Sequence, residues 1–371
     1  MTNCADRPTK PLNMNDTMLT RAECAVLRGL AIIGIFLHNY CHWLGPVVKE
    51  NEYTYSQHNV DWLQAVTAAP DGLLPAHLIS FFGHYGVPVF LFLSAYGLEM
   101  KYGRTLYVPA LRFIWYHWKK LFSMMIVGFV CFTVIDAITP GHWHYTMTQV
   151  LAQMAMVNNL LSDPDHNIWP GPFWFFGLML QLYIVYRLLL YKRHWAWTAG
   201  AMVVCLAIQL ALDPESDALN WYRYNFMGGM LPFGLGLLFA RYGERVIMAR
   251  LSTPSLAVAV VLCGFMVAGM SDNFVLWSLL PLVVCILAVY VARLLSQTSH
   301  IAAVGWLTDR LVWMGDISAA LFVIHPALRK VFIPVSRHGD VYTGLLLYAI
   351  AAVGAAWLIR LVMTKIPKPK M

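Results

Sequence analysis

The sequence predicts an all-α polytopic membrane protein with about ten transmembrane helices, and three observations predict it. Hydrophobic residues make up 59% of the 371 positions and charged residues only 12%, whereas a soluble domain carries about 25% charged residues. The mean hydropathy is +0.58. Apolar runs of roughly 18 to 25 residues recur along the whole chain, and this is the length that crosses a hydrocarbon core of about 30 Å.

The apolar runs give the positions of the expected spans. These are residues 25–47, 78–100, 121–140, 173–191, 195–212, 225–241, 255–270, 274–293, 311–330 and 342–362. No connection between them is long enough to bury a core of its own. The sequence therefore predicts three parts, namely a cytoplasmic N-terminal segment at 1–24, a transmembrane domain at 25–362 and a basic cytoplasmic tail at 363–371.

The net charge of +7 is distributed unevenly between the two sets of connections. Most lysines and arginines fall in the termini and in alternate connections, while the opposite connections hold few, mainly Lys49, Arg223, Lys330 and Arg337. Such asymmetry follows the positive-inside rule and predicts that both termini are cytoplasmic. The net positive charge thus reflects membrane topology. The expected partner is the lipid bilayer, and nucleic acid binding is excluded.

The first expected span contains three costly residues, Arg28, His38 and His42. A charged group near the middle of a span costs at least ~2.5 kcal/mol, so such groups are usually functional. Arg28 is close enough to the cytoplasmic end to act alternatively as a positive-inside anchor. His38 lies ten residues further on, about 15 Å along a helix and about 80° off the Arg28 face. This depth favours a catalytic or proton-handling histidine over a packing one.

His38 and His42 are i and i+4 neighbours on a helix. A metal pair is conceivable, but two histidines alone make a weak case for zinc, so we expect no metal. Further polar residues in expected spans include Asp136 and Gln181, and Asp316, Ser318 and His325 lie around the ninth. Ser318 and His325 are separated by about 10 Å of helical rise and so cannot form a local nucleophile pair.

Two long outer connections, at 48–77 and 141–172, contain polar and aromatic residues. Apolar residues between 150 and 160 recur at roughly helical spacing and predict an amphipathic helix on the membrane or over a cavity. The aromatic residues Tyr53, Tyr55, Trp143 and Trp169 could stack on sugar rings, although an interfacial aromatic belt explains them equally well.

Five stretches resemble, in order and spacing, motifs of the membrane acyltransferase-3 family of O-acyltransferases. They are "LRGLAIIGIFLH" (27–38), "FFGHYGVPVFLFLSAYGLEM" (81–100), "RFIWYHWKKLF" (112–122), "FWFFGLMLQLYIVYRLL" (173–189) and "GDISAALFVIHP" (315–326). The resemblance runs from about Arg21 to the last span. It implies transfer of an acyl group, expected to be acetyl, from cytoplasmic acyl-CoA to a hydroxyl of a cell-surface carbohydrate or glycolipid.

The resemblance also implies roles for particular residues. The arginine and histidine of the family's first helix, which are required for activity there, correspond to Arg28 and His38. His38 is then expected to deprotonate the acceptor hydroxyl, and Arg28 to steady either the donor or the developing oxyanion. In the family the histidine usually follows the arginine by eleven residues, whereas in this chain the spacing is ten. Either His38 or His42 could therefore be the base. The flanking sequence "LAIIGIFLH" aligns with the family motif without a gap and favours His38. The phosphates of acyl-CoA are expected on a basic stretch that comprises Arg104, Arg112, His117, Lys119 and Lys120, although these residues also serve as topology determinants.

The remaining expectations are supporting roles, cofactors and location. His42, Ser318, His325 and Trp174 are expected to support the site. No permanently bound cofactor is expected, and acyl-CoA is a co-substrate. The expected location is the bacterial cytoplasmic (inner) membrane; the sequence predicts no oligomeric state. Two alternatives stay open, namely a secondary transporter that uses Arg28, His38 and Asp136 as a substrate or proton path, and a non-catalytic helper of glycan export.

Overall fold

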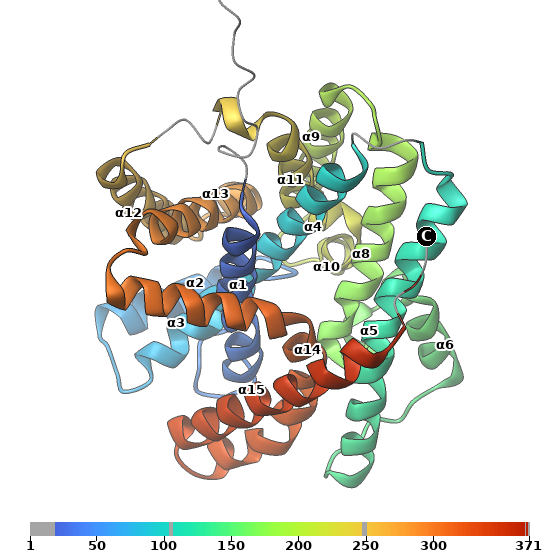
Figure 1. Cartoon of the computed structure of the whole chain (residues 1–371). Helices are drawn as coiled ribbons and strands as arrows, with labels where there is room; N and C mark the ends of the chain where they lie inside the picture. The colour runs from blue at the N-terminus through green and yellow to red at the C-terminus, as the bar shows by residue number, and fades with distance from the viewer. Residues whose placement is uncertain (1–18, 104–106, 247–250, 368, 370–371) are drawn as a thin grey trace, which may run out of the picture.

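The apolar runs form helices because hydrocarbon offers no partners to backbone N–H and C=O groups, which must then bond within the segment. The computed structural model in Figure 1 describes residues 19–103, 107–246, 251–367 and 369, and these form no strand. The α-helices are α1 (Arg21–Cys41), α2 (Gln57–Ala68), α3 (Leu74–Phe82), α4 (Gly86–Tyr102), α5 (Ala110–Ile138), α6 (Met147–Ala155), α7 (Pro164–Asn167), α8 (Trp174–Val185), α9 (Trp195–Ala211), α10 (Asp217–Tyr224), α11 (Phe226–Val246), α12 (Thr253–Met270), α13 (Phe274–Thr298), α14 (Ala302–His338) and α15 (Val341–Lys365).

Within the described ranges, 8 helical segments are long and apolar enough to cross a membrane. They are Arg21–Cys41, Leu74–Tyr102, Ala110–Ile138, Gly171–Leu190, Thr253–Met270, Phe274–Thr298, Ala302–His338 and Val341–Lys365. The other two expected spans correspond to α9, an apolar helix of 17 residues, and α11, of 21 residues. An all-α polytopic membrane protein is therefore confirmed. The cytoplasmic placement of both termini stays a prediction.

The third span begins earlier than its hydropathy indicates. The sequence places it at 121–140, whereas α5 begins at Ala110 and runs for 29 residues. Arg112, Lys119 and Lys120 therefore lie on the first turns of a helix and are exposed there. The hydropathy pattern misses these turns because long basic side chains can extend from a membrane helix to the interface.

Helix α1 lies at the centre of the bundle and crosses the long helix α14 (Figure 1). Small residues permit this close crossing. A Cβ at Gly29 would collide with the backbone oxygen of Leu311, and one at Gly315 would collide with that of Ala25. Since helices in lipid associate largely through close packing, such small residues mark contact faces. The helix that carries Arg28 is thereby fixed in the protein interior.

The connection after α5 is fastened to α14 by Asp136, which is 1% exposed. Its carboxylate forms an ion pair with Lys330, and it accepts hydrogen bonds from the Trp143 backbone N–H at 2.9 Å and the Tyr145 hydroxyl at 3.3 Å. Asp136 is thus a buried clamp, and its charge is already compensated. The amphipathic helix expected in this connection is present as α6, although it ends at Ala155.

Candidate active site

His38 lies in the last turn of α1 and is 2% exposed. Its Nδ1 is 2.6 Å from the backbone oxygen of Ser80. Because a carbonyl oxygen can only accept, Nδ1 carries the proton and Nε2 of the neutral ring keeps its lone pair. This is the tautomer that a general base needs, and the hydrogen bond fixes the orientation of the ring.

The depth of His38 in the bundle depends on a glycine in the 3₁₀ turn η1 (Gly83–Tyr85), which connects α3 to α4. A Cβ at Gly83 would lie 2.5 Å from the Cβ of His38 and 2.6 Å from the backbone oxygen of Gly34. Any side chain at position 83 would push α1 away from η1. The glycine of the "FFGHYG" stretch therefore permits the close approach that sets the position of the imidazole.

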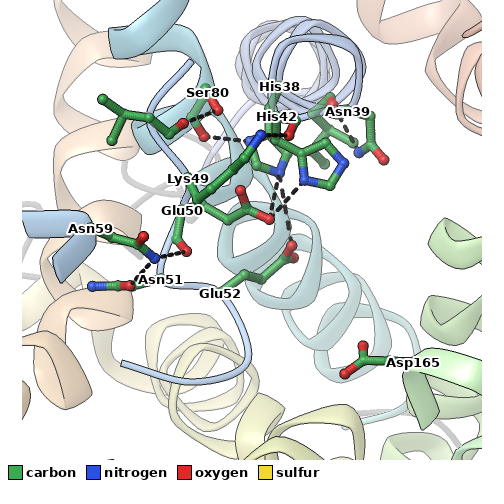
Figure 2. Close-up of polar contacts among 12 residues, drawn as sticks. His38, Asn39, His42, Lys49, Glu50, Asn51, Glu52, Asn59, Ser80 and Asp165 are labelled. Carbon is green, nitrogen blue, oxygen red and sulfur yellow. Dashed lines mark hydrogen bonds and ion pairs between the residues drawn. The ribbon is translucent and has the colours of Figure 1, made fainter. Parts of the chain in front are cut away.

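Two carboxylates from the connection after α1 face the Nε2 atom of His38, as Figure 2 shows. Nε2 is 3.9 Å from Glu50 Oε1 and 3.9 Å from Glu52 Oε2. His42 Nδ1 is 2.8 Å from Glu50 Oε1. The sequence analysis did not single out these two residues.

The connection that carries Glu50 and Glu52 is held over the end of α1 by hydrogen bonds to backbone carbonyl groups (Figure 2). The Lys49 ammonium donates to the Leu44 carbonyl at 2.8 Å and also to that of His42. The Ser80 hydroxyl donates to the Val48 carbonyl at 2.6 Å. Ser80 thus contacts both His38 and the connection, so the histidine and the two glutamates are held in one arrangement.

The pKa values of the two glutamates are shifted in opposite directions. Burial and the neighbouring Glu50 charge raise the pKa of Glu52 to about 8. Burial also acts to raise the pKa of Glu50, but attraction to the rings of His42 and His38 outweighs it and holds that pKa well below the usual range. Of the two carboxyl groups, Glu52 therefore holds a proton more readily and Glu50 less readily than a free glutamate.

Replacing Glu52 with glutamine should make the stability of the protein less dependent on pH. The folded pKa of about 8 lies above the ordinary value of 4.5, so the stabilisation that the bound proton provides is complete below pH 4.5 and is lost as the pH rises through 8. We expect the unfolding midpoint of Glu52→Gln, relative to wild type, to be higher at pH 8 than at pH 5. Thermal unfolding in detergent at the two pH values measures this, with the exposed Glu215→Gln as control; equal differences at both pH values would contradict it.

A cavity of about 330 Å³, here called the outer chamber, lies beside these glutamates. Glu50, Glu52 and Asp165 supply its carboxylates and Arg329 supplies a guanidinium. Aromatic side chains form much of the remaining wall, namely Trp43, Tyr53, Trp169, Trp174, Phe175, Tyr224 and Phe322. Flat apolar faces beside a few polar groups are typical of small-molecule sites. The name follows the orientation predicted from the basic residues.

Arg329 is fixed at the wall of the outer chamber. Its Nη1 donates to the backbone oxygen and to the side-chain Oδ1 of Asn39, both at 3.3 Å. The guanidinium lies over the Trp43 ring, 4.6 Å from its centroid. Asp165, also in the chamber wall, accepts a hydrogen bond from the Tyr224 hydroxyl at 2.6 Å. The chamber therefore carries charges of both signs, each held by neighbouring side chains.

A second cavity of about 260 Å³, here called the inner chamber, lies on the Arg28 side of His38. Apart from Arg28, Lys120, Ser94, Ser318 and Tyr183, its wall is apolar. Arg28 is half-buried and forms no ion pair with an acidic side chain in the described ranges. A cation of this kind favours an anionic ligand in the chamber.

The predicted basic stretch is only partly gathered at the inner chamber. Lys120 lines it, whereas Arg112 and Lys119 are exposed on α5 and are absent from its wall. His117 is 4% exposed and packs among aromatic rings, with the Tyr183 centroid 4.6 Å away. Arg104 lies outside the described residues. The assignment of this stretch to acyl-CoA stays a prediction.

The predicted supporting residues lie in three different places. Trp174 lines the outer chamber and Ser318 lines the inner one, where its hydroxyl donates to the Gly315 carbonyl at 2.8 Å. His325 is fully buried, its Nδ1 is 3.1 Å from the Leu321 carbonyl oxygen, and it lines neither chamber. Of the outer aromatic residues, Tyr53 and Trp169 reach the outer chamber, while Tyr55 packs against Trp277.

The histidine pair has a carboxylate neighbour that the linear sequence hides. One ligand atom each from His38, His42 and Glu50 lie within 4.8 Å of one another. Two histidines and a carboxylate form a donor set that zinc uses, and the Nδ1–H bond from His38 to Ser80 resembles the support of a metal-bound imidazole. These three residues could therefore hold a metal ion, and the expectation that none binds stays a prediction.

The helices, the buried imidazole and the two chambers define an integral membrane protein with a polar site enclosed between its spans. The acyltransferase domain model of the acyltransferase-3 family matches residues 23–361, which is nearly the whole chain. The protein therefore belongs to this family of membrane acyltransferases, and the resemblance read from its motifs is confirmed. No curated protein and no solved structure gives a significant match.

Proposed function

We propose that the protein transfers an acyl group, with acetyl as the expected one, from acyl-CoA to a hydroxyl of a cell-surface carbohydrate or glycolipid. The donor binds through the inner chamber and the acceptor through the outer chamber. His38 is the general base, and the expected location is the bacterial cytoplasmic membrane. Family membership supports the acyltransferase activity; the donor, the acceptor and the residue roles are our proposal.

One observation supports the proposal most directly, namely the orientation of His38. Its Nδ1 is bound to Ser80, and its Nε2 faces Glu50 and Glu52, whose side chains line the outer chamber. A hydroxyl that bridges Nε2 and a carboxylate would fit the 3.9 Å separations, since two hydrogen bonds of about 2.8 Å can meet at one oxygen. In the proposal, the acceptor hydroxyl binds between this nitrogen and the carboxylates.

The reaction is an ester exchange in which atoms and charge balance. The acceptor oxygen attacks the thioester carbonyl while His38 Nε2 takes its proton. The carbon–sulfur bond then breaks, and the proton passes to the departing CoA sulfur, so the products are an ester and free CoA. A neutral imidazole suits both steps because its free nitrogen can take up the proton and pass it on.

The positions of the charged groups support a division of labour between the chambers. Arg28 lies about 15 Å of helical rise from His38 and lines the inner chamber, which favours binding of the CoA phosphates over contact with the reacting carbonyl. In the outer chamber, Tyr53, Trp169 and Trp174 offer aromatic faces. Sugar rings combine apolar C–H faces with hydroxyl edges and would match such a wall.

The decisive experiment uses purified protein in nanodiscs with acetyl-CoA labelled on the acetyl group and a panel of mono- and oligosaccharides. We expect the label to appear on an acceptor with release of one free CoA thiol per ester. Proteoliposomes in which a solute moves while acyl-CoA is not consumed would instead support the transporter alternative. Absence of both activities, with a well-folded protein, would favour the export helper.

A further inference from the structure

Three apolar side chains belong to the walls of both chambers. Ile35 comes from α1, Phe175 from α8 and Phe322 from α14. No other residue in the described ranges lines both cavities. Because these three side chains contribute to both walls, they stand between the chambers and form a partition. Ile35 also lies one helical turn before His38, so the partition is next to the base.

The partition is closed by packed aromatic rings. The ring centroids of Phe175 and Phe322 are 5.2 Å apart, which is within the range of interacting aromatic pairs. Phe176 supports Phe322 from the inner side, with centroids 5.8 Å apart, and Phe90 supports Phe175 at 6.5 Å. None of the three partition side chains carries a hydrogen-bonding group. An apolar group can therefore replace their mutual contacts, whereas a phosphate or a sugar would lose its hydrogen bonds there.

We propose that Ile35, Phe175 and Phe322 form a gate that sets the length of the acyl group the enzyme transfers. The inference rests on the proposed function. A donor whose phosphates stay near Arg28 must bring its thioester carbonyl to the hydroxyl beside His38. The acyl chain extends beyond that carbonyl, away from the CoA sulfur. It therefore enters the space that the two phenylalanine rings and the acceptor occupy.

The gate should discriminate by size because its two rings contact each other and are backed by further rings. An acetyl group adds only one methyl beyond the carbonyl, so it can pass with a small rotation of the rings. Each further methylene must displace a packed ring or the acceptor itself. A hydrophobic pocket typically separates substrates that differ by one methylene by about 10-fold to 200-fold. We therefore expect a steep loss of activity from acetyl to longer donors.

The test measures kcat/KM for acetyl-, butanoyl- and hexanoyl-CoA in full-length wild type and in variants Phe322→Ala and Phe175→Ala. We expect wild type to prefer acetyl, and each alanine variant to raise the ratio of hexanoyl to acetyl transfer at least about 10-fold. The matched control is Phe239→Ala, because Phe239 is also a buried phenylalanine but lines neither chamber. That ratio should stay within about 2-fold of wild type in the control.

The outcomes separate this inference from the proposed function. If wild type transfers no acyl group from any donor, the proposed function fails. Two results overturn the gate while leaving the proposed function intact. In the first, wild type transfers acetyl, and the folded variants Phe322→Ala and Phe175→Ala keep the wild-type ratio. In the second, wild type prefers the longer donors. Should the alanine variants fail to fold, Phe322→Leu and Phe322→Trp provide the test. The smaller leucine must raise the ratio of hexanoyl to acetyl transfer, and the larger tryptophan must lower it. Unchanged ratios in both variants overturn the gate.

Discussion

Replacing His38 with glutamine should lower the rate of acyl transfer by about 10²-fold to 10⁴-fold, the usual contribution of a general base. Glutamine can still donate a hydrogen bond to the Ser80 carbonyl, which His38 Nδ1 contacts at 2.6 Å. It has no lone pair that takes up a proton near neutral pH. The loss should therefore fall on kcat, with the thermal unfolding midpoint close to that of wild type.

The matched control for this prediction is His42→Gln. His42 is 24% exposed and its Nδ1 is bound to Glu50 at 2.8 Å, so its loss should disturb Glu50 but leave the base in place. We expect a rate reduction of at most about 10-fold. Steady-state kinetics of both variants with acetyl-CoA decide between the two histidines. Full activity in His38→Gln together with an inactive His42→Gln would make His42 the base.

The choice between these two histidines shows which features of the site can be predicted from the sequence and which cannot. Hydropathy locates the spans because each must satisfy its own backbone in lipid, and the cost of Arg28 and His38 in such a span marks them as candidates. The linear sequence does not reveal which ring nitrogen is free. That depends on Ser80, which is 42 residues away along the chain, and hence on tertiary packing.

Glu50 and Glu52 could not be predicted from hydropathy in the same way. Glu50 and Glu52 lie in a connection without helical periodicity, and they reach His38 because Lys49 and Ser80 fasten that connection to the end of α1. Hydrogen bonds to backbone oxygens of this kind are not specified by a local pattern of residue types. The beginning of α5 at Ala110 was missed for a related reason, since its basic side chains mask a helix that continues past the apolar core.

The helical angle between Arg28 and His38 was informative even before their neighbours were known. Ten residues place the two side chains on different faces and about 15 Å apart in rise. In the structure, Arg28 lines the inner chamber, and the Nε2 of His38 faces carboxylates of the outer one. This separation fits the proposed division of roles, in which Arg28 binds the donor and His38 activates the acceptor.

Replacing Arg28 with methionine should raise the KM for acyl-CoA by about 10-fold to 100-fold, which corresponds to the loss of one hydrogen bond to a charged group. Methionine keeps the apolar stem and removes only the charge. Because Arg28 has no acidic partner among the described residues, its removal leaves no buried carboxylate uncompensated. Folding should therefore be preserved, and kcat at saturating donor should change by less than about 3-fold.

The division of the effect between KM and kcat tests where the arginine acts. A group that binds donor and transition state equally well changes KM alone, whereas one that contacts the developing oxyanion changes kcat. Arg28→Lys should recover part of the affinity because a lysine still offers a charge to phosphate, without the bidentate geometry of a guanidinium. A large fall in kcat with an unchanged KM would place Arg28 at the reacting carbonyl. The partition of Ile35, Phe175 and Phe322 between the two chambers would then have to open during each turnover.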